Sequence, residues 1–235
     1  MKEHILFKLA TRSRMQKAYN SILNIMEMCQ SDNYTILLSC DFDDAAMKNF
    51  KFNDERVIVC YGNSLNKIDA INRDINDVSR LFDWDILINT SDDMVFTTKG
   101  FDNIIRQDFK DDYDQVLHYS DGNQKDNIMT MSIMGYFYYK RFNYIYHPNY
   151  KSLWCDAEAT EVAVLLGKYR YMGDDKVLFR HMHPAWGLAE SDEQYQKTES
   201  QAMWNHDYKV ILERKARNYD LPQHLIINPP KYAKL

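Results

Sequence analysis

The chain has 235 residues, of which 45% are apolar and 27% are charged, and it carries a formal net charge of −5. These values are those of an ordinary globular protein and argue against a disordered chain, and the length allows one large domain or two small ones. The negative net charge and the lack of a long basic run argue against non-specific binding to nucleic acid.

Four cysteines are spread along the chain without CxxC spacing: Cys29, Cys40, Cys60 and Cys155. Such isolated cysteines fit a reducing compartment. The first residues carry no signal-peptide core, and no apolar run approaches the ~18–20 residues of a membrane-spanning helix. We therefore expect a soluble, cytoplasmic protein without a membrane span.

The first half of the chain alternates short apolar runs with segments of helical periodicity. The apolar runs, which are typical of buried strands, lie at 4–10, 34–40, 56–61 and 86–88. Helices are expected over 15–29 and 67–81, where apolar residues recur at helical spacing. The order strand, helix, strand, strand, helix, strand predicts an α/β fold with a mainly parallel sheet.

The second half is less regular. Short strands are expected at 116–119 and 177–179, and the apolar stretch 128–135 is expected to be buried. Helices are expected over 136–146, where the helix leads into another short strand, and over 159–166, ending at Gly167.

The last segment differs in character from the rest. Residues 191 to 219 are charged and helical in pattern. Pro222, Pro229 and Pro230 prevent this helix from continuing into the tail. We expect one domain over 1–190, with a nucleotide-binding half over 1–96 and an acceptor half over 97–190. A C-terminal helical extension and tail follow over 191–235.

The run from Trp84 to Phe96 places two adjacent carboxylates, Asp92 and Asp93, directly after the buried strand 86–88. Buried acidic groups are costly unless they are neutralised, and a divalent cation such as Mg²⁺ or Mn²⁺ binds hard oxygen ligands. The alternative is a turn in which Asp92 caps a helix.

Polar residues follow three of the expected strands. Thr11, Arg12, Ser13 and Arg14 follow the first strand, Asp41 and Asp43 follow the second, and Asp92 and Asp93 follow the fourth. In an open α/β sheet, ligands bind beyond the carboxyl ends of the strands. An aspartate can accept hydrogen bonds from a base or ribose, and an arginine can pair with phosphate. The polar residues that follow these three strands together favour nucleotide binding. The alternative is that each is an ordinary loop residue, because loops are commonly polar.

The order of these motifs between Ile5 and Trp186 resembles that of the GT-A fold glycosyltransferases, similar to the inverting family 2. The resemblance implies a Rossmann-like, mainly parallel sheet flanked by helices. It implies a set of donor-binding residues, namely Thr11, Arg12, Arg14, Asp41, Asp43, Lys67, Asn72, Arg73 and Ser91. It places the metal-binding DxD-type motif on Asp92 and Asp93, and it suggests His181 and His183 as further metal ligands.

The resemblance also implies catalytic residues. Asp156 matches the general base of the family, and the usual glutamate partner is replaced by Cys155, with Glu158 nearby. A second departure is Thr90, which occupies the first acidic position of the usual motif. Asp156 could instead be only a helix cap. The two histidines could be structural residues.

Two tryptophans complete the expected site. Trp154 and Trp186 are expected to stack on the acceptor, although buried core tryptophans are more common.

The implied activity is transfer of a sugar from a nucleotide-diphosphate donor, most simply a UDP-sugar, to an acceptor hydroxyl with inversion. Mn²⁺ or Mg²⁺ is the implied cofactor, and the acceptor is a glycan or another hydroxyl-bearing molecule. A nucleic-acid acceptor and a homodimer stay open, as does the role of 191–217, which either covers the cleft or contributes to a dimer. The rival functions are a metal-dependent nucleotidyltransferase and a non-catalytic sugar-nucleotide or carbohydrate-binding protein. A nucleotidyltransferase usually carries a glycine-rich phosphate loop after the first strand, and residues 9–14 contain no glycine.

Overall fold

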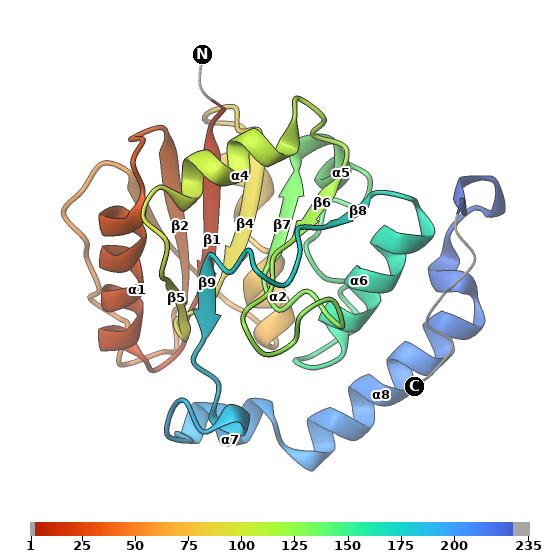
Figure 1. Ribbon diagram of the computed structural model, residues 1–235. Helices are drawn as coiled ribbons and strands as arrows, with labels where there is room; N and C mark the ends of the chain where they lie inside the picture. Colours follow the sequence, from red (N-terminus) through yellow and green to blue (C-terminus); the bar gives the residue numbers. More distant parts are fainter. Residues whose placement is uncertain (1–2, 228–235) are drawn as a thin grey trace.

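The computed structural model describes residues 3–227, and its centre is a mainly parallel sheet (Figure 1). Within these residues the sheet has seven strands in the order β3-β2-β1-β4-β7-β6-β8. The strands are β1 (Ile5–Ala10), β2 (Tyr34–Asp41), β3 (Val57–Gly62), β4 (Ile86–Thr90), β6 (Val116–His118), β7 (Ser132–Gly135) and β8 (Tyr169–Tyr171). Only β7 runs antiparallel to its neighbours. The α/β class and the mainly parallel sheet predicted from the sequence are confirmed.

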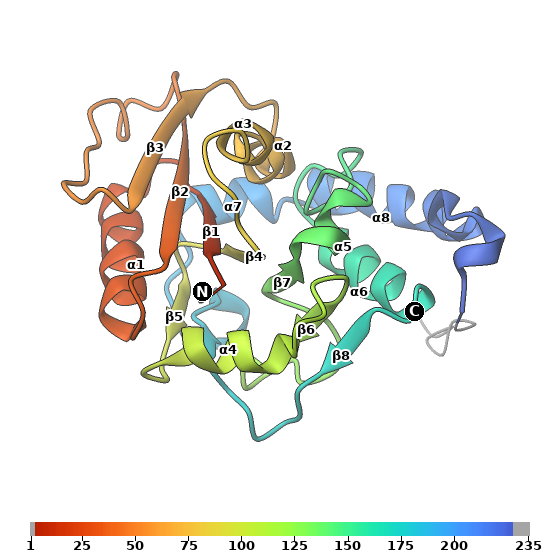
Figure 2. The ribbon, with the colours of Figure 1, turned by 90° about the horizontal axis from the view of Figure 1, so that it is seen from above.

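Helices cover both faces of the sheet (Figure 2). One face carries α1 (Met15–Met28) and α4 (Phe101–Phe109). The other carries α2 (Lys67–Asn72), α3 (Ile75–Val78), α5 (Tyr136–Lys140) and α6 (Cys155–Leu165). Because successive side chains of a strand point to opposite faces, β1, β2 and β4 supply both cores and have mainly apolar sequences.

The chain after β8 crosses back to the carboxyl end of the sheet. There β9 (Phe179–His181) pairs antiparallel with β5 (Met94–Phe96), which follows β4 directly. The chain then forms α7 (Glu193–Thr198), below the sheet in Figure 1, and α8 (Gln201–Ala216), which packs against α6. Short 3-10 turns lie at Pro184–Trp186, Asn218–Asp220 and Gln223–Leu225. No helix in residues 3–227 is long and apolar enough to cross a membrane.

Several predicted elements differ in their bounds. The helix expected over 67–81 is two short helices, because Asp74 adopts a left-handed backbone with φ of 72°. There Arg73 turns to donate hydrogen bonds to the Cys40 carbonyl and the Ser64 hydroxyl (2.9 Å to the latter), so contacts with neighbouring segments break the helix.

Four further expectations need correction. The helix expected over 136–146 ends at Lys140, and no strand follows it within 141–150. The last helix before Gly167 begins at Cys155 rather than 159, and the strand expected at 177–179 lies at 179–181. The helix α4 was not expected at all, although Phe101, Ile105 and Phe109 form an apolar face at helical spacing. Pro229 and Pro230 lie outside the described residues.

Candidate functional site

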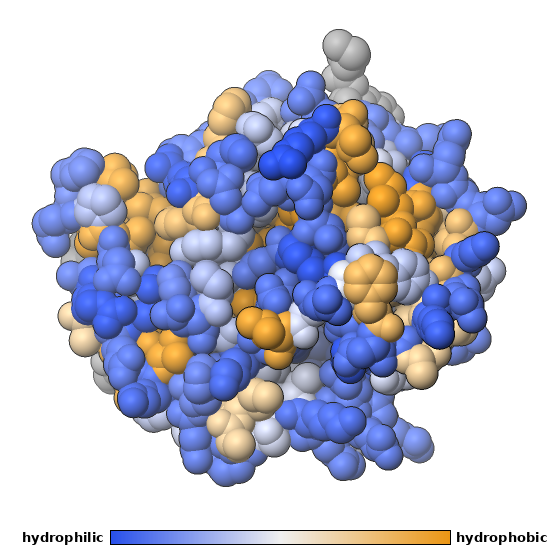
Figure 3. All heavy atoms as spheres, turned by 180° about the vertical axis from the view of Figure 1, so that it is seen from behind, coloured by the Kyte–Doolittle hydropathy of each residue, from blue (hydrophilic) through white to orange (hydrophobic). Residues whose placement is uncertain are grey.

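A cleft of about 550 Å³ lies at the carboxyl edge of the parallel strands, where the polar residues after β1, β2 and β4 meet. α2 and α3 cover this side of the sheet, and the surface on the same side is mostly hydrophilic and is hollowed below its centre (Figure 3). The segment from Gln194 to Met203, in α7 and the start of α8, also lines the cleft. Of the two roles considered for residues 191–217, the structure therefore places this part over the cleft.

Asp92 lies in the turn between β4 and β5 and is tied to the loop after β1. Its carboxylate accepts hydrogen bonds from the Thr11 hydroxyl at 2.7 Å and from the Arg14 guanidinium at 3.0 Å. The side chain is only 5% exposed. Burial raises the pKa of Asp92, while Arg14 and Thr11 act in the opposite direction. Both carboxylate oxygens are thus already held by the protein.

Asp93 faces the histidine that ends β9. Because Met94 and His181 are paired in register, the His181 ring lies beside Asp93, with Nε2 3.5 Å from the carboxylate. The Met182 amide also donates to the Asp93 carbonyl at 2.8 Å. Burial acts to raise the pKa of Asp93, but the hydrogen bonds from His181 and Ser91 outweigh it and hold the pKa well below its usual range. Asp93 is therefore an ionised oxygen donor next to an imidazole.

His183 lies beside His181. The two rings are 4.8 Å apart, and the His183 ring accepts a hydrogen bond from the Ala185 amide at 3.3 Å. Burial lowers the pKa of His183. The ring also packs edge-on against Tyr195 of α7. His183 therefore connects the cleft floor to the helix that covers it.

The loop after β1 carries two arginines that pair with acids on other segments. Arg12 donates to Asp41 at 2.8 Å and forms a two-pronged pair with Asp43 at 2.7 and 2.8 Å. Arg14 bridges Asp92 and Asp192, the residue that caps α7. The predicted donor-binding residues that follow β1 and β2 thus belong to two ion-paired groups, Arg12 with Asp41 and Asp43, and Arg14 with Asp92 and Asp192.

Asp156 lines the cleft from the first turn of α6. Its carboxylate accepts a hydrogen bond from the Ala157 amide at 2.9 Å, so the capping expected of it is only local. Burial raises the pKa of Asp156, against the lowering effect of the Ala157 amide, Lys67 and His181. Asp156 is therefore a partly buried carboxyl group of increased basicity, within electrostatic range of His181 on the Asp93 side of the cleft.

Solved structures of glycosyltransferases share this arrangement of elements. The mannosyltransferase PcManGT from Pyrobaculum calidifontis, in complex with GDP-Man and Mn²⁺, matches with a TM-score of 0.57 and 9% identity over 96% of this chain and 78% of its own. The fold is that of the GT-A glycosyltransferases.

A second match, TarS 1–349 from S. aureus in complex with UDP-GlcNAc, has a TM-score of 0.55 and 12% identity over 94% of this chain and 74% of its own. A longer TarS structure matches with a TM-score of 0.53 and 13% identity, and this chain spans 50% of it. At these identities the matches establish the GT-A-like fold. A scan of protein-family models and a search of curated proteins find no match.

Two side chains expected to bind the donor have structural partners in this GT-A-like fold. The Asn72 amide binds the backbone of Ile145 and Tyr146, at 2.9 Å to the Ile145 amide. Arg73 binds Asp74 at 3.0 Å and reaches Asp41 only at 3.5 Å. Asn72 therefore anchors the segment after α5, and Arg73 supports the end of β2 from behind the cleft.

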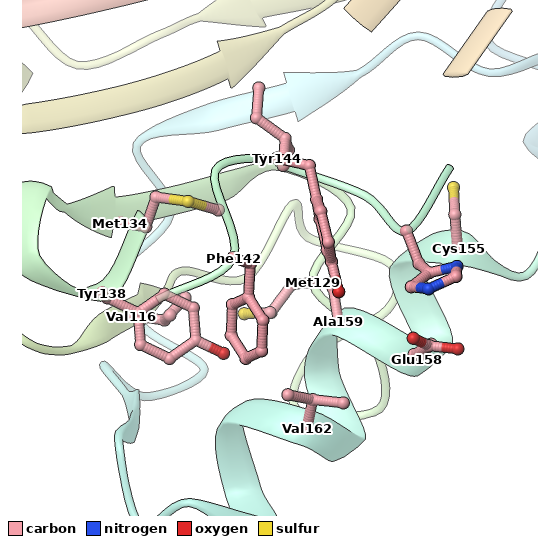
Figure 4. A pocket seen from close by; sticks show the side chains of 12 residues that line it. Val116, Met129, Met134, Tyr138, Phe142, Tyr144, Cys155, Glu158, Ala159 and Val162 are labelled. Atoms are coloured by element: carbon pink, nitrogen blue, oxygen red, sulfur yellow. The ribbon is translucent and has the colours of Figure 1, made fainter. Parts of the chain in front are cut away.

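Glu158 was expected beside the general base, and the structure gives it different partners. It is 4% exposed, accepts a hydrogen bond from Tyr150 at 2.7 Å and forms an ion pair with Arg214 of α8 at 2.7 Å. Figure 4 shows Glu158 on α6 with aromatic and aliphatic side chains around a small cavity. Of the residues that line this cavity, only Cys155 also lines the main cleft. These contacts join α6 to α8.

The two tryptophans expected at the acceptor site lie outside the main lining. Trp154 packs against Trp204 and Tyr208 of α8, with ring centroids 5.6 and 5.1 Å away. Trp186 is 46% exposed in the 3-10 turn after His183. Trp154 therefore has an aromatic packing environment, while Trp186 presents a free face near the cleft rim.

Several cleft residues were not predicted from the sequence. They come from β4, from the loops before β7 and α6, and from α7: Asn89, Thr130, Tyr146, Lys151, Ser152, Gln194, Tyr195, Lys197, Thr198 and Glu199. Burial raises the pKa of Glu199, and Asp156 adds to this effect against Lys67. The only sequence signal for α7 was its helical pattern, with Asp192 as an N-cap residue.

The cleft offers few side chains that could bind a divalent cation. Within residues 3–227, no three or more His, Cys, Asp or Glu side chains converge as a complete metal site. Asp93 and His181 nevertheless present an ionised oxygen and a ring nitrogen side by side. This donor pair suits Mn²⁺ when a diphosphate and water complete the coordination, whereas Mg²⁺ prefers oxygen ligands throughout.

Proposed function

We propose that this protein is a metal-dependent glycosyltransferase that moves a sugar from a nucleoside-diphosphate donor to an acceptor hydroxyl with inversion. The observation that carries the proposal is the placement of Asp93, His181 and Asp156 in one cleft at the carboxyl edge of a GT-A-like sheet. The GDP-Man, UDP-GlcNAc and Mn²⁺ in the matching structures support this class of donor and cofactor.

The donor nucleotide occupies the β1 and β2 end of the cleft in this proposal. Asp41 and Asp43 accept hydrogen bonds from the base or ribose, and Arg12 orients both carboxylates. Lys67, an exposed cation on the cleft wall, faces the diphosphate. This arrangement leaves the sugar on the side of the turn 91–93 that faces α6.

Asp93 and His181 are the residues that hold the cation. A bound Mn²⁺ or Mg²⁺ neutralises charge on the diphosphate leaving group. Asp92 does not bind the cation but positions Asp93. Thr11 and Arg14 hold the Asp92 carboxylate, and this fixes the turn that carries Asp93. Arg14 and Lys67 add positive charge to the same region of the cleft.

Asp156 is the proton acceptor in this proposal. Its burial raises its pKa, which makes its carboxylate a better base for the acceptor hydroxyl than an exposed aspartate. The hydroxyl oxygen forms the new bond to the anomeric carbon while the bond to the diphosphate breaks, and the proton passes to Asp156. Attack from the face opposite the leaving group inverts the anomeric configuration.

The test is a thermal-shift screen of UDP, GDP, CMP and dTDP, each with and without Mn²⁺. Binding to the native state raises the melting temperature, so we expect one nucleotide to give a shift that depends on the metal. Asp93→Asn and His181→Ala should each remove the dependence on metal. The exposed Asp83→Asn and His224→Ala, which lie outside the cleft lining, are the matched controls. No shift with any nucleotide would contradict the proposed donor.

Catalysis is tested separately from binding. Incubation with the corresponding nucleotide sugar should release free nucleotide, slowly by hydrolysis and faster when a suitable acceptor is present. A protein that binds the donor but releases no nucleotide under any condition would be the non-catalytic binding protein considered from the sequence.

A further inference from the structure

Three side chains at the inner wall of the cleft hold polar atoms without hydrogen-bond partners. They are Oδ1 of Asn89 on β4, Oγ1 of Thr130 before β7 and Oγ of Ser152 before α6. Asn89 is 6% exposed and Ser152 is 4% exposed. Residues 3–227 contain seven buried side-chain nitrogen and oxygen atoms without a hydrogen-bond partner. Four of the seven belong to residues that line the cleft, namely these three and Nε of Arg14.

Asn89 stands in a polar row across the sheet. It is in register with Lys8 on β1 and Ser132 on β7, and all three residues point to the face that carries α2 and α6. One step deeper on this face the register partners are Leu6, Leu87 and Met134, which belong to the apolar core. The polar row therefore marks the level at which the core ends and the cleft begins.

The neighbours of Asn89 in this row are satisfied within the protein. Lys8 donates a hydrogen bond to Ser39, and Ser132 donates to the Tyr146 hydroxyl at 3.3 Å. Buried polar atoms in native proteins are nearly always paired, so an unpaired one at a cavity wall calls for a specific explanation. Three such atoms, on residues from three different segments that line one cavity, point to a polar ligand.

We propose that Asn89, Thr130 and Ser152 form the subsite for the hydroxyl groups of the donor sugar, and that this subsite selects an uncharged sugar. The inference rests on the proposed function. Asn89 precedes Asp93 by four residues, and Ser152 precedes Asp156 by four. The sugar must lie between the diphosphate near Asp93 and the acceptor oxygen near Asp156, so these three residues form part of the cleft wall that it meets.

The chemistry of the three groups explains the selectivity. The Asn89 oxygen only accepts hydrogen bonds, whereas the two hydroxyl groups both donate and accept. Sugar hydroxyls match this set, because each of them can donate one hydrogen bond and accept others. A sugar carboxylate cannot donate to Asn89 and would lie between the carboxylates of Asp93 and Asp156. The subsite therefore fits a neutral hexose or N-acetylhexosamine and disfavours a uronic acid.

The test measures by calorimetry, in the presence of Mn²⁺, how much the sugar adds to nucleotide affinity. The ligands are UDP, UDP-GlcNAc, UDP-glucose, UDP-glucuronic acid, GDP and GDP-mannose. For the nucleotide that binds, we expect a neutral sugar to tighten binding and glucuronic acid not to do so. Thr130→Val, Ser152→Ala and Asn89→Leu should each reduce the advantage of the neutral sugar by about three- to tenfold, with unchanged affinity for the plain nucleotide.

Stability provides a second readout. Because an unpaired buried hydroxyl contributes nothing favourable to the free protein, Ser152→Ala should melt no lower than the wild type while it loses sugar affinity. Tyr34→Phe is the matched control, since it removes another unpaired hydroxyl outside the cleft lining. Tyr34→Phe should leave both nucleotide and sugar affinity unchanged.

The outcomes separate the subsite from the proposed function. If the plain nucleotide binds but the sugar advantage is unchanged in both Thr130→Val and Ser152→Ala, the subsite is wrong and the proposed function stands. Equal binding of neutral and uronic sugars overturns the selectivity. If no nucleotide binds at all, the proposed function fails and the subsite fails with it. The two hydroxyl variants keep the side-chain shape, so they decide the test even if Asn89→Leu does not fold.

Discussion

Arg14 and Asp192 are 178 residues apart in the sequence and form an ion pair at 2.5 Å across the mouth of the cleft. Asp192 also pairs with Lys17 at 2.8 Å and caps α7. Burial acts to raise the pKa of Asp192, but its pairs with Arg14 and Lys17 outweigh this and hold the pKa well below the usual range. Since Arg14 also holds Asp92, one guanidinium connects the acidic turn to the helix that covers it.

This connection predicts that Asp192→Asn loosens α7 without unfolding the protein. The pair is partly exposed, so its loss should cost at most about 1 kcal/mol of global stability. Hydrogen exchange of residues 193–198 should nevertheless become faster, because both the ion pairs and the charged cap are lost. The Asp83→Asn variant should exchange like the wild type. Unchanged exchange in 193–198 would show that other contacts fix α7.

The proposed base gives a pH-dependent prediction. Asp156→Asn should lower the turnover number by about 10²–10⁴-fold and leave donor affinity unchanged, because the amide cannot take a proton. In the wild type, the rate should fall as the pH falls through the pKa of Asp156, which burial raises above its ordinary value. The measurement is the pH profile of transfer at saturating donor. Wild-type turnover in Asp156→Asn would reject Asp156 as the base.

The ion pair between Glu158 and Arg214 allows the structural role of Glu158 to be tested against the catalytic role expected from the sequence. Each side chain is 5% exposed, so removal of one partner leaves a buried charge. We expect Glu158→Gln and Arg214→Met to lose about 3–5 kcal/mol of unfolding free energy in urea titrations. Below the unfolding transition, both should keep donor binding and turnover. A Glu158→Gln variant of normal stability and abolished turnover would restore the catalytic role.

The first half of the fold could be predicted from the sequence because three of its strands, β1, β2 and β4, are buried on both faces. Such strands appear as mainly apolar runs, and the predicted run 34–40 corresponds to β2 at Tyr34–Asp41. The approach of Thr11 and Arg14 to Asp92 followed from the rule that parallel strands bring their carboxyl ends to one edge.

The other contributors to the cleft lie far apart in the sequence. Asn89 comes directly after the predicted strand 86–88, and its role depends on the register by which β4 includes it and places it beside Lys8 and Ser132. Glu199 enters the cleft only because β9 carries the chain back beneath the sheet. The break at Asp74 likewise depends on contacts of Arg73 with β2. Local periodicity contains none of these long-range contacts.

Lys8 provides a last prediction, which concerns stability. It is completely buried on β1, where burial lowers its pKa to about 7. Asp74 raises this pKa and Arg73 lowers it further. In an unfolded chain a lysine has a pKa of about 10.4, so the unfolded state binds more protons than the folded state between these two values. Lys8 therefore destabilises the fold below pH 7, and the penalty decreases as the pH rises.

We expect the free energy of unfolding to increase from pH 7 to 8.5, by at most about 1.4 kcal/mol per pH unit from this group. Lys8→Met, which is similar in length and uncharged, should flatten the increase, since it removes the titrating group and leaves Ser39 bonded to Asp74. Urea titrations at pH 6.5, 7.5 and 8.5 measure the slope. The upper limit of pH 8.5 keeps small the contribution of the thiols Cys40 and Cys60, whose pKa values are raised by burial and whose titration acts in the opposite direction at higher pH. An equal slope in the two proteins would mean that Lys8 keeps its proton throughout this range.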